Sequence, residues 1–110
     1  MPACQLFQSS KMEWVHVAPL GGVLKDPANG RYSAVIWTEQ HGRNVHLGSF
    51  EEFSYAGQSY DLVAIKCMGQ AAVTVFPRQH YARFQHELDS RTLDLLLTML
   101  RAHQDYTERP

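Results

Sequence analysis

The sequence has few of the features that mark secreted or membrane-bound proteins. It contains only two cysteines, Cys4 and Cys67, which form no Cys-x-x-Cys pair and predict no disulfide framework. No stretch approaches the roughly 18 consecutive apolar residues of a membrane span, and the first residues lack the basic and apolar regions of a secretory signal. We therefore expect a soluble protein of a reducing compartment, without membrane insertion, in which Cys4 is a tail thiol and Cys67 a small core residue.

Positive charge is not in excess either. Ten lysines and arginines face eleven acidic residues, giving a net charge of -1 and a pI of about 6.6, whereas isolated DNA-binding modules often have a pI above about 9. The 110 residues, 45% hydrophobic and 19% charged, fit a single globular domain. Composition alone does not favour a nucleic-acid partner.

Motifs for catalysis and metal binding are also missing. The chain has no G-x-S-x-G elbow and no G-x-x-x-x-G-K-[ST] phosphate loop. None of its six histidines stands in an H-E-x-x-H pair, and no cysteine pair accompanies them. We expect no enzymatic activity, no cofactor and no bound metal.

Hydrophobic alternation predicts a three-stranded antiparallel sheet. A strand-like run begins at 14–17 and continues toward Val23, interrupted by Pro19 and by a glycine pair that suggests a bulge or a close backbone approach. The turn formers at 25–30 predict a hairpin into a strand at 31–39. A second turn, Gln40-His41-Gly42, leads into the third strand at 43–48. The buried face is expected to carry Tyr32, Ala34, Ile36, Val45 and Leu47.

A helix should follow the sheet. Ser49 and Glu52 fit a capping box, the helix should run to about Met68, and Gly69 is a plausible stop. Small or apolar residues recur at helical spacing and should face the sheet: Phe53, Ala56, Gly57, Tyr60, Val63, Ala64 and Cys67. The segment 71–76 is a short β-rich ending.

A second helix is predicted near the C-terminus, capped by Asp89 or Ser90. Leu93, Leu96, Leu97 and Leu100 form its apolar stripe, whereas Leu95 and Met99 lie outside that stripe and would be free for a partner. The predicted class is α+β: a three-stranded antiparallel sheet packed on one helix, plus a C-terminal helix. The expected limits are an arm at 1–13, a domain at 14–77, a linker at 78–88 and the last helix at 89–105.

Four sequence blocks resemble the Apetala-two/ethylene-response-factor (AP2/ERF) DNA-binding domain: GGVLKDPANGRYSAVIW, VHLGSFEE, YAGQSYDLVAIK and MGQAAVTVF. In order and spacing they match the strand, helix and ending motifs of that family over about half the chain. The nearest type is the RAV type, whose short P-N-G-R hairpin, A-V-T-N-F ending and later M-L-R-K-H-x-Y helix are similar to segments here.

The resemblance implies a module that lays the outer face of its sheet in the major groove of double-stranded DNA, and thus a nuclear transcription regulator. Under this resemblance, the residues expected to contact DNA are Lys25, Arg31, Val35, Trp37, Arg43, Asn44 and His46. Trp37 stands where the family has an arginine on the second strand, and His46 where it has a tryptophan on the third.

An alternative function remains open: the fold could instead serve as a protein-interaction module or a structural subunit of a larger complex, in an organelle or the cytoplasm. It is motivated by the acidic balance and by an apolar strip expected on the outer face. That partner surface would comprise Leu24, Val35, Trp37, Leu95 and Met99. For Trp37 itself, packing on a cross-strand neighbour is the alternative to a binding role.

Overall fold

The structure is a computed structural model that describes residues 12–108, with only the backbone for 101–108. One antiparallel sheet has the strand order β1-β2-β3-β4. The strands are β1 (Glu13–Ala18), β2 (Gly21–Lys25), β3 (Tyr32–Thr38) and β4 (Arg43–Phe50). The α+β class is confirmed, but the sheet has four strands rather than three. Most of the predicted arm lies outside the described residues, and Glu13 already belongs to β1.

The extra strand arises because the run from Trp14 toward Val23 reverses at Pro19 and Leu20 instead of continuing. The glycine pair after this turn lets the chains approach closely. A Cβ on Gly21 would lie 2.1 Å from the carbonyl oxygen of Val35, and one on Gly22 would lie 2.0 Å from that of His16. Only glycine fits at both positions, so β2 can be sandwiched between β1 and β3.

Both predicted turns are present. In the first, Asp26 Oδ1 accepts a hydrogen bond from Ala28 N and Asn29 Oδ1 accepts one from Arg31 N, both at 2.9 Å. Gly30 then takes a φ of 72°, which glycine adopts without the strain of a side chain. The second turn closes through a hydrogen bond from Gly42 N to Thr38 O.

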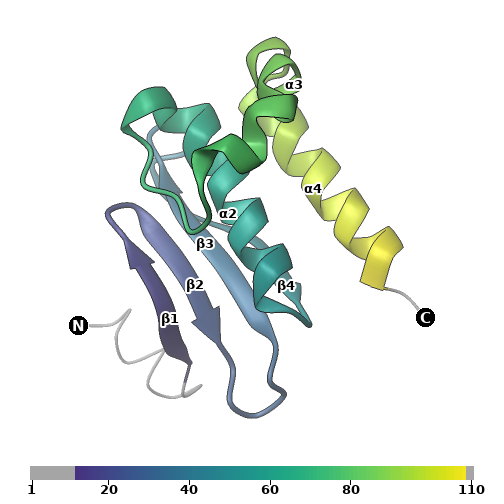
Figure 1. Cartoon of the computed structure of the whole chain (residues 1–110). Coiled ribbons are helices and arrows are strands. Elements are labelled where there is room, and N and C mark those ends of the chain that lie inside the picture. The colour runs from purple at the N-terminus through teal and green to yellow at the C-terminus, as the bar shows by residue number, and fades with distance from the viewer. Residues whose placement is uncertain (1–11, 109–110) are drawn as a thin grey trace.

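The helix α2 (Phe53–Met68) packs across one face of the sheet, called the inner face here (Figure 1). Of the predicted inner strand residues, Ala34, Ile36, Val45 and Leu47 are buried and Tyr32 is half-buried; Ala56, Tyr60, Val63 and Ala64 of the helix are also buried. Cys67 is exposed, which contradicts its expected core position, so the apolar side of α2 ends one turn earlier. Although the residue is exposed, partial desolvation of its sulfur raises the pKa of the thiol, and nearby Lys66 partly opposes that shift.

The predicted capping box at the start of α2 is wrong. The N-cap is Glu52, without a side-chain cap hydrogen bond. Ser49 still belongs to β4 and accepts a hydrogen bond from Arg31. The hydroxyl of Ser49 is therefore engaged across the sheet instead of at the helix end.

After Gly69 ends α2, a short η1 (Gly69–Ala71) leads into an irregular segment instead of the predicted β-rich ending. Asp61 of α2, fully buried, accepts hydrogen bonds from Val75 N at 2.7 Å and Phe76 N at 2.9 Å. Gly57, one turn earlier, makes room for Phe76, whose ring would lie 2.7 Å from a Cβ there. The carboxylate satisfies the backbone donors that a neighbouring strand would otherwise satisfy.

The segment 78–88, predicted as a linker, is largely helical. It contains η2 (Arg78–Phe84) and most of α3 (Gln85–Ser90). Tyr81 of η2 donates a hydrogen bond to Asp61. Burial, followed by this hydrogen bond and the charge of Asp61, raises the pKa of the Tyr81 phenol. These contacts anchor the segment to α2. The periodicity of the sequence did not predict this anchoring.

The last helix, α4 (Leu93–Glu108), starts later than predicted. Thr92 rather than Asp89 or Ser90 caps it, accepting a hydrogen bond from Leu95 N at 3.2 Å. Leu93, Leu96 and Leu97 are buried as expected. Within the described range, no helix is both long and apolar enough to cross a membrane.

Candidate nucleic-acid interface

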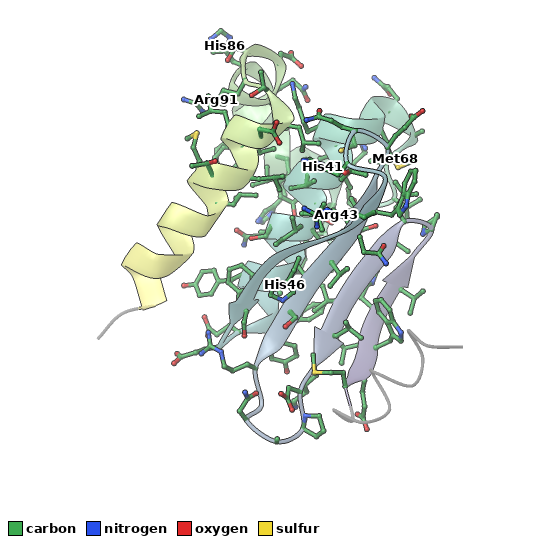
Figure 2. The ribbon with its side chains drawn as sticks, turned by 180° about the vertical axis from the view of Figure 1, so that it is seen from behind. His41, Arg43, His46, Met68, His86 and Arg91 are labelled. Atoms are coloured by element: carbon green, nitrogen blue, oxygen red, sulfur yellow. The ribbon has the colours of Figure 1, made fainter. Side chains whose placement is uncertain are left out.

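The outer face of the sheet, opposite α2, is built by strand alternation. The register pairs Val35 with His46 and Trp37 with Asn44 across β3 and β4. Their neighbours in sequence, Ala34, Ile36 and Val45, are buried against the helix. Val35, Trp37, Asn44 and His46 therefore share the exposed side of β3 and β4. Figure 2 looks onto this side, with His46 on β4.

Trp14 and Val17 join this face from β1, and neither was predicted from the sequence as a site residue. The register shifts between Trp14 and His16, so Val15 forms a bulge. Because of this shift, Trp14 is paired with Leu24 and Val17 with Gly22 on the same outer side. Trp14 is 47% exposed and Trp37 41%. The break in alternation at 14–17 was the signal that an additional strand with a bulge was present.

Leu24 does not belong to the exposed strip predicted as a partner surface. Its side chain is only 1% exposed. The prediction of exposure did not allow for the additional strand β1, which puts Trp14 in register beside Leu24. In the structure β2 is an interior strand, and Leu24 lies between Trp14 of β1 and Ser33 of β3.

The cation nearest the outer face is Arg31. Its Nε donates to Ser49 Oγ at 3.0 Å and an Nη donates to Ser49 O at 2.6 Å. Ser49 is paired with Ser33 on β3. A second Nη lies 3.9 Å from the Glu51 carboxylate, an exposed contact of small energetic weight. The guanidinium is thus fixed at the end of the sheet by the β4 backbone.

The other two predicted cations lie at strand ends rather than over the middle of the outer face. Lys25 Nζ is 5.5 Å from the centroid of the Tyr32 ring, and this ring makes an edge-to-face contact with Phe53 of α2. Arg43 pairs with the buried Thr38, so alternation turns it toward the helix side, and its guanidinium reaches Asn44 O at 3.4 Å. Both cations lie at the rim of the surface, at the ends of β2 and β4.

The turn before Arg43 is held in place by contacts with α4. His41 Nε2 lies 3.0 Å from Asp94 Oδ1 of α4, and Thr38 Oγ1 lies 2.7 Å from His41 Nδ1. Gln40 adds a hydrogen bond to Asp94 at 3.1 Å. The start of α4 thereby holds the β3–β4 turn that carries Arg43 and Asn44.

Leu95 and Met99, the helical part of the predicted partner surface, are exposed at 47% and 39%. They lie on α4, which packs on α2 and β4 on the helix side of the sheet (Figure 1). The structure therefore does not bring them together with Val35 and Trp37. Among the described residues, no group of three or more His, Cys, Asp or Glu side chains could hold a metal ion.

Comparison with known proteins adds an independent observation. No family model matches the chain. It is 32% identical over 88 residues to the AP2-like ethylene-responsive transcription factor AIL7 of Arabidopsis thaliana. The aligned residues cover 73% of this chain and 18% of that protein. The chain is 38% identical over 84 residues to the AP2/ERF and B3 domain-containing transcription repressor TEM1 of the same plant, covering 74% and 22%.

A third similar protein is the ethylene-responsive transcription factor WRI1 of Arabidopsis thaliana, 28% identical over 88 residues, covering 73% of this chain and 20% of that protein. The curated homologues are thus transcription factors of the AP2/ERF type. The chain spans about a fifth of the length of these three relatives.

Proposed function

We propose that this chain is the DNA-binding module of a transcription regulator and that the outer face of β2, β3 and β4 enters the major groove. The observation that carries this proposal is the convergence of Val35, Trp37, Asn44 and His46 on one exposed surface. The described helices all pack on the opposite side (Figure 1). The similarity to transcription factors supports the same function.

The dimensions of the sheet suit this docking. Neighbouring strands lie about 4.8 Å apart, so β2 and β4 are separated by about 10 Å. The major groove of B-form DNA is about 12 Å wide. Three strands can therefore lie against the base edges, while β1 would sit near a groove wall.

The residues of the surface divide into two roles. The amide of Asn44 can both donate to and accept from adenine, and the neighbouring His46 ring offers one donor or acceptor. Val35 and Trp37 supply apolar contacts of the kind that recognise a thymine methyl group. These side chains would determine sequence preference.

Arg31, Lys25 and Arg43 would contact phosphates at the two ends of the strands. Three such contacts predict a slope of about -3 for the logarithm of affinity against the logarithm of salt concentration. That is a modest electrostatic contribution, consistent with the net charge of -1. Affinity at physiological salt would then depend strongly on the base contacts.

Fluorescence anisotropy with random-sequence double-stranded DNA, at low and at physiological salt, tests the proposal. Arg31→Ala should weaken binding and reduce the salt slope by about one. Arg83→Ala, a cation on the helix side, is the matched control and should change neither. Absence of binding at low salt, or equal effects of both substitutions, would reject the DNA-binding surface.

A protein-interaction module is the second candidate, favoured by the exposed Trp14, Val17 and Trp37 on the outer face and by Leu95 and Met99 on α4. In that case binding to the partner would respond little to salt. Under the DNA proposal the chain acts in the nucleus and has no catalytic activity; under the alternative it acts in an organelle or the cytoplasm. The kinship to the RAV type is part of the same proposal and is supported by the short hairpin at 27–31, which is similar to the P-N-G-R hairpin of that type.

A further inference from the structure

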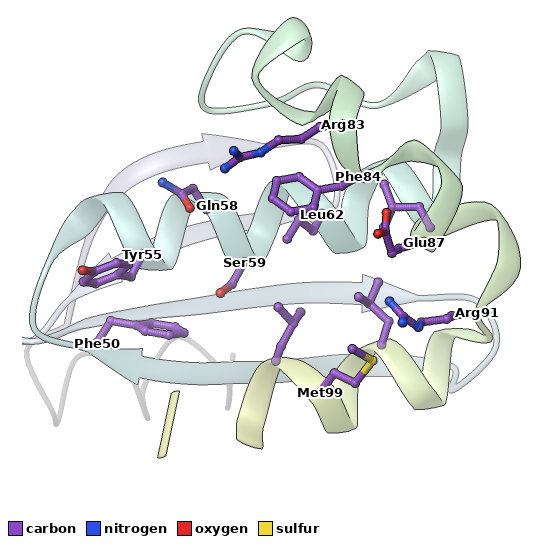
Figure 3. Close-up of a pocket in the computed structure, with 13 residues that line it drawn as sticks. Phe50, Tyr55, Gln58, Ser59, Leu62, Arg83, Phe84, Glu87, Arg91 and Met99 are labelled. Atoms are coloured by element: carbon purple, nitrogen blue, oxygen red, sulfur yellow. The ribbon is translucent and has the colours of Figure 1, made fainter. Parts of the chain in front are cut away.

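A groove of about 520 Å³ lies on the helix side of the molecule, between α2, the η2–α3 segment and α4 (Figure 3). Its α2 side is formed by Tyr55, Gln58, Ser59 and Leu62. These positions are spaced by three, four and seven residues and therefore form one face over two helical turns. The groove is thus a trough parallel to a helix and not an isolated pit.

The two other walls are also helical faces. Phe84 and Leu88 come from η2 and α3, and Leu96 and Met99 from α4. Met99 and Tyr55 remain 39% and 46% exposed, although both are large and line this trough. Three helical faces that leave apolar side chains open between them offer the surface against which a fourth helix packs, ridges into grooves.

The charges at the groove select the chemistry of such a helix. Arg83 and Arg91 flank Phe84 and Glu87 in Figure 3. Arg83 lies over the Phe84 ring, 4.8 Å from its centroid. Within the described part of the chain, neither arginine forms a salt bridge. Both guanidinium groups are therefore available to carboxylates of a bound segment.

Glu87, the one acidic residue of the lining, adds a further requirement. Its Oε2 is buried and has no hydrogen-bond partner among the described residues. A buried unpartnered carboxylate oxygen is costly. A segment that carries a donor, such as a serine hydroxyl or an asparagine amide, facing Glu87 would relieve that cost.

We propose that this groove binds a short amphipathic helix of a partner protein, with bulky apolar residues on one face, carboxylates on its flanks and a donor side chain between them. Complementary charge at Arg83 and Arg91 favours this occupant over a basic or purely apolar segment. The groove lies on the side of the sheet away from Val35 and Trp37. A partner helix and DNA can therefore bind at the same time, and the proposal does not depend on DNA binding.

The test uses the full chain and a fluorescein-labelled designed peptide of about four helical turns. Leucine or phenylalanine occupies every third or fourth position, glutamates lie on the flanks and one serine lies at the centre of the apolar face. A matched peptide has lysine in place of every glutamate. Both are titrated by anisotropy, while the tryptophan emission of the protein is recorded.

The acidic peptide should bind at least tenfold more tightly than its lysine counterpart, and Arg83→Glu and Arg91→Glu should each weaken it about tenfold. Arg43→Glu, a charge reversal at the sheet, should leave peptide binding unchanged. Circular dichroism melts verify that each variant is folded. A further substitution, Met99→Lys, should abolish binding, because it places a charge in the apolar trough.

Three results would overturn the proposal. The first is equal binding of the two peptides, as expected of a nonspecific apolar surface. The second is binding that survives both arginine reversals in folded protein. The third is a dimer, detected by sedimentation, that Met99→Lys dissolves, which would assign the groove to a second copy of the chain.

Discussion

The phenol of Tyr81 donates a hydrogen bond to the buried carboxylate of Asp61, joining η2 to the middle of α2 across 20 residues of sequence. The same carboxylate accepts hydrogen bonds from the backbone of Val75 and Phe76. One side chain therefore anchors the whole segment that follows α2. It also fixes a wall of the groove, because Phe84 lies at the end of the same η2.

Replacing Asp61 with Asn should destabilise the protein strongly. An amide offers one oxygen where the carboxylate offers two, and its NH₂ group would face backbone donors. We expect a loss of about 2 to 4 kcal/mol in the free energy of unfolding. Urea titration followed by circular dichroism measures it. A loss below about 1 kcal/mol would show that these hydrogen bonds are not essential to the fold.

Stability should fall at alkaline pH, with Tyr81 contributing to the loss. The unfolded phenol ionises near pH 10, whereas burial and Asp61 raise the pKa of Tyr81 in the folded chain. Above pH 10 the unfolded state therefore releases its proton first, and stability present below that pH is lost as the pH rises. Tyr60, with a pKa raised by burial and by the charge of Asp61, acts in the same direction.

Tyr81→Phe should be less stable at neutral pH but lose less stability between pH 9 and about 11 than the parent chain. Thermal melts across that range provide the comparison. Parallel curves for the two proteins would contradict the assignment of the alkaline loss to Tyr81.

The close approach of β2 and β3 predicts unequal costs for two glycine substitutions. Gly21→Ala would put a Cβ against the Val35 carbonyl, which is backbone and cannot move aside without displacing the strand. We expect a loss above about 2 kcal/mol. Gly30→Ala meets no atom within 4 Å and suffers only from its φ of 72°, so about 1 kcal/mol is expected. Equal losses would mean that the strands can separate without cost.

Asn44 and Arg31 should affect DNA binding differently. Asn44→Ala should weaken binding to a selected target sequence by about tenfold, because a base contact is removed, and should hardly change binding to random DNA. Arg31→Ala should weaken both, because phosphates are alike in every sequence. Selection from a randomised DNA pool followed by anisotropy separates the two. An equal loss on both kinds of DNA would mean that Asn44 contacts the phosphate backbone of the DNA instead of a base.

The fold class, both hairpin turns, α2 and the stripe of leucines in α4 could be predicted because each follows from local periodicity or turn chemistry. The sheet's fourth strand could not, since Pro19 and the bulge at Val15 break the alternation that reveals a strand. The cap at Ser49 was wrong because Arg31, distant in sequence, claims its hydroxyl. The role of Asp61 as an anchor follows only from its tertiary contacts, which no local pattern indicates.

The residues of the outer face were predicted on β3 and β4 but not on β1. Val35 and Trp37 follow from simple alternation along β3, and Asn44 and His46 follow from alternation along the part of β4 that precedes its register shift. Trp14 depends on the bulge, and the burial of Leu24 depends on the strand that the bulge belongs to. Positions set by non-local pairing cannot be read from one segment alone.

The most direct test of the proposed DNA-binding face uses the two tryptophans of the chain, Trp14 and Trp37, which both lie on it. Their indole N–H signals are followed by NMR while isotope-labelled protein is titrated with duplex DNA, together with the backbone amides of β3, β4 and α4. We expect the signals of Trp37, Asn44 and His46 to shift or broaden saturably and those of α4 to remain unchanged. Shifts confined to α4 and the groove, with the indole signals unchanged, would contradict the proposed DNA-binding face.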